Sequence, residues 1–253
     1  MRQRGNRNGR DAALRPVGAA RRPYQIVLIA IALFSSLLST FAQPLSQSEI
    51  HDLLVRIRAA RAAAPNTQAD FREEKTLRLL NKPIVSAGKM WFQAPDKFRR
   101  EVGGNAPSLT VSNGRELWIY YPNFKSAEHY SLGKRSPVDA AIATINTALN
   151  LDNAENTFSI NGAKMDSPSP GSGAAGIHYE LALSPRAAAM KRLFEKFELR
   201  LNQDLFAERT EMVQPNGERV VTTYSNQSRA AVPASMFQFT PPAGTEITTP
   251  LGR

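Results

Sequence analysis

The residues that could take part in chemistry are few, and their spacing fits no common reaction centre. Three histidines, His51, His129 and His178, are too few for a His-rich metal site, and the absence of cysteine excludes thiolate ligands and thiol nucleophiles. Gly88-Lys89 and Gly133-Lys134 lack the upstream glycine of a phosphate-binding loop, and no GxGxxG or GxSxG motif occurs. The sequence therefore predicts no metal, no cofactor and no enzymatic activity.

The positive charge of the chain is concentrated near its N-terminus. The net charge is +10, but residues 1–25 hold seven arginines and one acid, and so carry +6 of it. In the body, the cations of Lys191–Arg200 alternate with acids, as on a solvated strand face. Trp91 and Trp118 could stack on bases, but in a mildly basic body they fit a core or a cavity wall better. We therefore expect no nucleic-acid partner.

The first 42 residues have the order of a signal peptide. The arginine-rich stretch is followed by the apolar run Ile26–Leu38 and by the small residues around Thr40 and Ala42. The apolar run is shorter than the roughly 20 residues of a membrane span. We expect cleavage after Ala42, which leaves residues 43–253 as one exported domain; retention of residues 1–42 as an anchor is the alternative.

The elements of the exported domain begin with one helix. Ser46 and Glu49 form a capping-box pattern, with Ser46 as the N-cap. Ile50, Leu53, Leu54 and Ile57 then follow at the i, i+3, i+4, i+7 spacing of one apolar helix face, and the pattern stops before Pro65. This face could pack on a core, or it could form a lid over a cavity.

The remaining sequence is mostly β in pattern. Asn113-Gly114 and Asn216-Gly217 favour the positive φ angles of a type I′ hairpin turn, and Asp166–Gly176 is expected at another hairpin tip. Gly88 is expected at a bulge or a point of close packing. About ten short strands with tight turns indicate an antiparallel meander rather than βαβ units. Besides a segment before Asp166, the expected strands are 71–80, 84–92, 98–102, 109–111, 117–121, 177–183, 197–201, 206–213 and 220–224.

A second helix is predicted from Pro137 to Leu149. Pro137 suits the first turn of a helix, and Val138, Ile142 and Ile145 share its apolar side. A short helix in a β-rich chain is stabilised mainly by the surface that it covers. We interpret this helix as a lid; a helix on a fixed core is the alternative.

Three motifs in order resemble the outer-membrane lipoprotein carrier protein (LolA) family. The first is Gly88–Pro95 followed by Phe98-Arg99, the second is Val111–Gly114 with Leu117–Pro122, and the third is Phe237–Gly244. The resemblance covers roughly residues 46–248. Many carriers have an arginine, thought to tie the lid to the barrel, where this chain has Ala94 before the proline of the first motif.

The resemblance implies a mainly β fold of the α+β type: an incomplete, curved antiparallel β-barrel whose helices cover an apolar cavity. It also implies a monomeric periplasmic carrier that shuttles lipoproteins by their acyl chains from the inner to the outer membrane. Its partners would be a lipoprotein-releasing ABC transporter of the inner membrane and, if present, a lipoprotein acceptor of the outer membrane. The residues expected to line the cavity and lid are Leu53, Leu54, Ile57, Phe71, Met90, Phe92, Phe98, Leu117, Ile119, Val138, Ile142 and Ile145.

Two other functions stay open at this point. A lipid- or lipoprotein-sensing module on the same fold, possibly membrane-anchored, would need a cavity but no shuttle. An exported hydrolase would need a polar triad, and the sequence offers none. A carrier is favoured on physical grounds, because an exposed chain of about 15 methylenes costs roughly 12 kcal/mol in water. The chain has no nucleotide motif, so the energy for loading would come from the transporter.

Overall fold

The structure is a computed structural model, and it describes residues 42–132, 151, 154–168 and 175–249. All of these residues belong to one compact unit. The segment predicted as a signal peptide lies outside the described residues, apart from Ala42. The helix predicted at 137–149, with Val138, Ile142 and Ile145, lies outside them as well.

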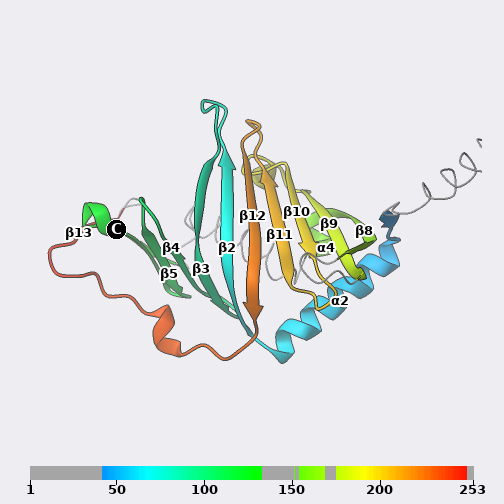
Figure 1. Cartoon of the computed structure of the whole chain (residues 1–253), viewed down its shortest axis with the longest axis horizontal. Coiled ribbons are helices and arrows are strands. Elements are labelled where there is room, and N and C mark those ends of the chain that lie inside the picture. Colours follow the sequence, from blue (N-terminus) through cyan, green and yellow to red (C-terminus); the bar gives the residue numbers. More distant parts are fainter. Residues whose placement is uncertain (1–41, 133–150, 152–153, 169–174, 250–253) are drawn as a thin grey trace, which may run out of the picture. The chain divides into compact units, whose positions relative to one another are not determined.

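The described residues form one 13-stranded sheet in the order β1-β8-β9-β10-β11-β12-β2-β3-β4-β5-β6-β7-β13 (Figure 1). Neighbouring strands are antiparallel, except that β13 runs parallel to β7. The sheet is open, because β1 and β13 lie at opposite edges. The strands are β1 (Ala42–Pro44), β2 (Asn66–Thr76), β3 (Ile84–Gln93), β4 (Lys97–Val102), β5 (Ser108–Asn113), β6 (Glu116–Tyr121), β7 (Ser126–Ser131), β8 (Phe158–Pro168), β9 (Ala175–Pro185), β10 (Lys196–Leu201), β11 (Ala207–Val213), β12 (Arg219–Ser228) and β13 (Glu246–Thr248).

The predicted mainly β class and the open, largely antiparallel sheet are confirmed, with three strands more than expected. The unexpected strands are β1, β7 and β13. Two of them have only three residues each, and β7 is largely polar, so none shows a clear apolar alternation. The predicted hairpin around Asp166–Gly176 is confirmed in its arms, because β8 pairs with β9 up to Pro168 and Ala175.

The two Asn-Gly turns join the expected strands but are not of type I′. Gly114 and Gly217 have φ angles of +89° and +80°, whereas neither preceding asparagine has a positive φ. Asn113 instead uses its side chain: its Oδ1 accepts hydrogen bonds from the backbone N–H groups of Arg115 and Glu116, both at 2.9 Å. Such side-chain bonding lets asparagine start a longer loop in place of a two-residue turn.

Helix α2 (Gln47–Ala63) has the predicted start and the predicted buried face. The Ser46 side chain accepts from the Glu49 N–H at 3.3 Å, and the Glu49 carboxylate accepts from the Ser46 N–H at 2.8 Å, which completes the capping box. The Ser46 hydroxyl also donates to the Glu49 carboxylate at 2.7 Å. This bond and the one from the Ser46 N–H lower the pKa of Glu49, because both favour the charged carboxylate. The helix lies beside the β8–β10 part of the sheet (Figure 1).

The other helical segments are short. They are α4 (Ala154–Thr157), α5 (Ala188–Lys191) and two 3-10 turns, η1 (Pro122–Phe124) and η2 (Ala234–Phe237). Within the described ranges, no helix is both long and apolar enough to cross a membrane.

The main core lies between α2 and one half of the sheet. Ile50, Leu53, Leu54 and Ile57 of the helix are almost fully buried. They belong to one cluster with side chains from β8, β9 and β10, among them Ile160, Leu181, Leu183, Leu199 and Leu201. The helix therefore covers this half of the sheet as a packed layer.

Candidate functional site

Two neighbouring hollows lie on the other part of the same sheet face. The larger has a volume of about 360 Å³ and is lined by strands β2, β3, β4, β5, β11 and β12 and by two phenylalanines, Phe194 and Phe197. The smaller, of about 100 Å³, lies where the end of α2 meets the loop before β11. Met90 and Tyr224 line both, so the two hollows adjoin. Their walls are mainly apolar.

Strand pairing explains why these side chains share one face. Opposite residues of neighbouring antiparallel strands point to the same side of a sheet. Tyr224 of β12 is opposite Phe71 of β2, and Met90 of β3 is opposite Arg100 of β4. Phe92 and Phe98 are likewise opposite each other. The register alone therefore places one continuous set of large side chains over the middle of the sheet.

A polar pair lies inside the larger hollow. An Arg100 guanidinium nitrogen is 3.1 Å from a Glu73 carboxylate oxygen, and both side chains are about one quarter exposed. The guanidinium also lies 4.3 Å from the centroid of the Phe71 ring, a cation–π contact. The Tyr224 hydroxyl is hydrogen-bonded to the Thr210 hydroxyl at 3.1 Å, and burial raises the pKa of Tyr224. The apolar walls thus include a hydroxyl pair and an ion pair, and the buried Arg100 Nη2 has no hydrogen-bond partner among the described residues.

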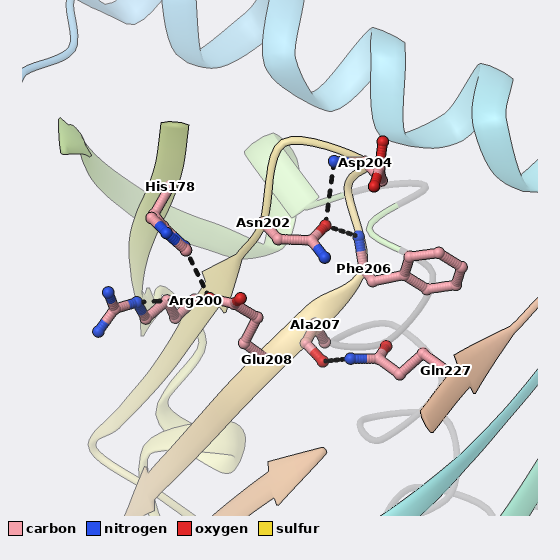
Figure 2. Close-up of polar contacts among 8 residues, drawn as sticks. All are labelled: His178, Arg200, Asn202, Asp204, Phe206, Ala207, Glu208 and Gln227. Carbon is pink, nitrogen blue, oxygen red and sulfur yellow. Dashed lines mark hydrogen bonds and ion pairs between the residues drawn. The ribbon is translucent and has the colours of Figure 1, made fainter. Parts of the chain in front are cut away.

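The loop between β10 and β11 shapes the rim of the smaller hollow (Figure 2). The Asn202 side-chain oxygen accepts hydrogen bonds from the N–H groups of Asp204 and Phe206, both at 3.0 Å. These bonds hold the Phe206 ring at the rim, where the Arg229 guanidinium lies 3.9 Å from its centroid. Gln227 donates to the Ala207 carbonyl at 2.8 Å and joins the loop to β12.

A second polar group lies next to this loop. The His178 ring is almost fully buried, and its Nδ1 lies 2.7 Å from a carboxylate oxygen of Glu208 (Figure 2). An Arg200 nitrogen lies 3.6 Å from the same carboxylate oxygen. This cluster contributes no side chain to either hollow. Across the described ranges, no group of three or more His, Asp or Glu side chains could hold a metal ion.

The residues expected at the site fall into four groups. Phe71, Met90, Phe92 and Phe98 line the hollows. The α2 residues Leu53, Leu54 and Ile57 pack into the closed core, away from both hollows. Leu117 and Ile119 lie on β6, outside either lining. Val138, Ile142 and Ile145 lie outside the described residues.

Sequence reasoning missed the β11–β12 side of the site. Met212, Val220 and Tyr224 line the larger hollow, and Phe206 lines the smaller one. The period-2 pattern of Val220, Thr222 and Tyr224 was available in the sequence, and it is the signal that could have identified one face. The sequence does not show that this face meets Met90 of β3, because that needs the pairing of β12 with β2.

The open sheet, with a long helix on one half and hollows beside it, defines a LolA-like fold. An uncharacterized conserved protein of Thermus thermophilus has this fold, with a TM-score of 0.50 at 11% identity, over 79% of this chain and 99% of that one. The family model described as "Outer membrane lipoprotein carrier protein LolA" matches residues 63–166. The chain is thus similar to the LolA family over this segment, which includes strands β2 to β7 and most of β8.

Two relatives extend this match over more of the chain. An outer-membrane lipoprotein carrier protein of Dechloromonas aromatica is 28% identical over 84% of this chain and 91% of its own length. A protein of the same description from Bordetella avium is 25% identical over 76% of this chain and 85% of its own length.

Proposed function

We propose that this protein is a periplasmic carrier that holds the acyl chains of lipoproteins and shuttles them from the inner to the outer membrane. The observation that carries the proposal is the apolar double hollow around Met90 and Tyr224, in a chain whose residues 63–166 match the LolA family model. Its larger part, about 360 Å³, is within the roughly 300–1,000 Å³ typical of ligand pockets. The names of the relatives support lipoprotein as the cargo.

The geometry suits a ligand with apolar chains and a polar linkage. Met90, Phe98, Met212 and Val220 would remove the chains from water, which is worth about 0.8 kcal/mol for each buried methylene. The Glu73–Arg100 pair lies among these apolar walls, where an ester or amide group could bind without leaving a polar atom unpartnered. Such a site can hold the lipid end of a lipoprotein and leave its polypeptide in solvent.

Directional transport needs partners on both membranes. An ABC transporter of the inner membrane would load the carrier, because the chain contains no nucleotide-binding motif of its own. An acceptor at the outer membrane would unload it by binding the cargo more tightly. We propose that the carrier acts as a monomer between them.

Export should leave a chain that begins at Gln43, because the small residues Thr40 and Ala42 precede it. N-terminal sequencing of the protein from the periplasm is expected to start at Gln43 or within a few residues of it. Recovery of the protein only from membranes, with residues 1–42 intact, would contradict a freely diffusing carrier.

The substitution Met90→Asp should abolish acyl binding, because Met90 lines both hollows and a carboxylate there must be desolvated by any acyl chain. We expect at least about a tenfold loss of affinity for a fluorescent fatty acid, with displacement of the probe by lipoprotein lost in parallel. The measurement is probe titration of the chain from residue 43, beside circular dichroism melts.

Met165→Asp is the matched control for this experiment. Met165 is also half-buried, but it is opposite His178 on the other face of the sheet and lines neither hollow. The Met165→Asp variant should bind the probe with the affinity of the unmodified protein. If Met90→Asp fails to fold, Met90→Gln tests the same site with a smaller desolvation cost. Unchanged binding in the Met90 variant, or equal loss in both variants, would contradict the site.

A further inference from the structure

The tip of the β2–β3 hairpin exposes apolar side chains that the fold does not use. Leu79 is 95% exposed, and Leu80, Ile84 and Val85 are each about half exposed. These four residues lie within seven positions around the turn between Thr76 and Ile84, which projects beyond the sheet in Figure 1. Single exposed apolar residues are normal on protein surfaces, but a contiguous exposed cluster marks an interaction site.

The same tip is positively charged. From Lys75 to Ser86 the chain contains three cations, Lys75, Arg78 and Lys82, and no acid. Among the described residues, none of these three side chains forms an ion pair. The nearest acid along the chain, Glu74, is already paired with Arg72 at 3.0 Å. The tip therefore combines exposed apolar side chains with cations that are available to bind an anionic partner.

The neighbouring hairpin shows that this composition is not a requirement of the fold. The β11–β12 turn reaches the same end of the sheet, because Arg219 of β12 is opposite Thr76 of β2. Its sequence from Gln214 to Glu218 consists of three polar residues, one proline and one glycine, and one of the polar residues is an acid. One of two adjacent turns is thus apolar and basic, while the other is an ordinary solvated loop.

We propose that the β2–β3 tip docks this protein on the surface of an anionic lipid bilayer. Leu79 and Leu80 would enter the headgroup region, while Arg78 and Lys82 contact lipid phosphates. Apolar side chains flanked by cations are the pattern of segments that lie in the membrane interface. Each cation near an anionic surface strengthens binding by about fivefold.

Docking at this tip would also orient the hollows. Glu73 of the larger hollow and Leu79 of the tip are six residues apart on the same hairpin arm. Because β2 ends at Thr76 and Leu79 lies in the turn, the rise of about 3.3 Å per strand residue makes their separation at most roughly 20 Å. The site would thus lie close to the membrane surface, with strands β2 and β3 running from the bilayer toward it. Membrane binding at the tip does not require the hollows to be loaded, so this proposal is independent of the proposed cargo.

The absence of cysteine allows a direct test of insertion. Leu79→Cys and Phe124→Cys, each in the chain from residue 43, would carry the same environment-sensitive fluorophore. Phe124 is the control because it is 79% exposed on η1, which joins β6 to β7 and is separated from the β2–β3 hairpin by β4 and β5. With vesicles of phosphatidylglycerol and phosphatidylethanolamine, we expect a blue shift and quenching by spin-labelled lipid at position 79 only. Phosphatidylcholine vesicles should give a much smaller response.

Vesicle sedimentation then tests the two components of binding separately. The pair Leu79→Asp with Leu80→Asp should lower binding to the anionic vesicles at least about tenfold. Arg78→Glu with Lys82→Glu should weaken it similarly and remove most of its dependence on salt. Phe124→Asp should bind normally, and thermal melts should be unchanged because every substituted side chain is exposed. Three results would overturn the proposal: no binding to anionic vesicles, equal insertion at position 124, or normal vesicle binding by the tip variants. Normal vesicle binding by the tip variants is also the result expected if the tip binds a membrane protein instead of lipid.

Discussion

Replacing Leu54 by alanine is expected to lower the free energy of unfolding by about 2–5 kcal/mol, because the side chain is fully buried and its removal leaves a cavity. Leu54 belongs to the cluster in which α2 packs on Leu181, Leu201 and Phe158. Urea or guanidinium unfolding followed by circular dichroism measures the loss as a shift of the midpoint at constant slope.

Val55→Ala is the matched control on the same helix. Val55 is 44% exposed, so its truncation should change the free energy of unfolding by no more than about 0.5 kcal/mol. The comparison decides between the two interpretations that the sequence left open for this helix. If Leu54→Ala proves as mild as Val55→Ala but weakens acyl binding, α2 acts as a movable lid and the packed layer described above is not a fixed core.

Replacing Gly88 by alanine should be similarly destabilising for a different reason. A Cβ atom at this position would overlap the backbone carbonyl oxygen of Glu101 and lie 2.8 Å from its carbon and 3.1 Å from the Val102 Cα. Backbone atoms in a paired strand cannot move aside as a flexible side chain can, so β3 and β4 would have to separate. We expect a loss of about 3 kcal/mol or more, at the upper end of the costs of overpacking.

The control for Gly88 is the nearby Gly103. A Cβ there would be 3.9 Å from the Ala87 carbonyl oxygen, an ordinary contact, and its φ lies outside the left-handed region. Gly103→Ala should therefore stay within about 1 kcal/mol of the unmodified protein. Equal stability of the two variants in thermal or denaturant melts would contradict the close approach of β3 and β4.

The parts of the fold that could be predicted are those specified by local signals. The Ser46 capping box and the apolar face of α2 were identified because a helix start and a 3.6-residue period involve neighbours in the chain. Strands β3, β4 and β6 were identified from alternation between turn residues. By contrast, β7 is stabilised by its pairing with β6 and β13, and its own residues carry little apolar pattern.

The site could be predicted only in part, because long-range pairing determines what each apolar residue faces. Met90 and Leu54 look alike in sequence, as large apolar residues at regular spacing. Met90 comes to line an open hollow, since β2 and β12 continue the sheet beside it, whereas Leu54 meets β9 and β10 and is enclosed. A periodic pattern shows that a face exists, but it does not show whether that face is filled or hollow.

The short strands β1 and β13 have a consequence for association between copies of the chain. An open sheet presents unpaired N–H and C=O groups at its edges, and these can pair with a second chain and start aggregation. Here each edge ends in a strand of only three residues, and β1 includes Pro44, which has no N–H to offer. These two edge strands would thus offer a second chain few backbone groups to pair with, which disfavours strand-to-strand polymerisation through them.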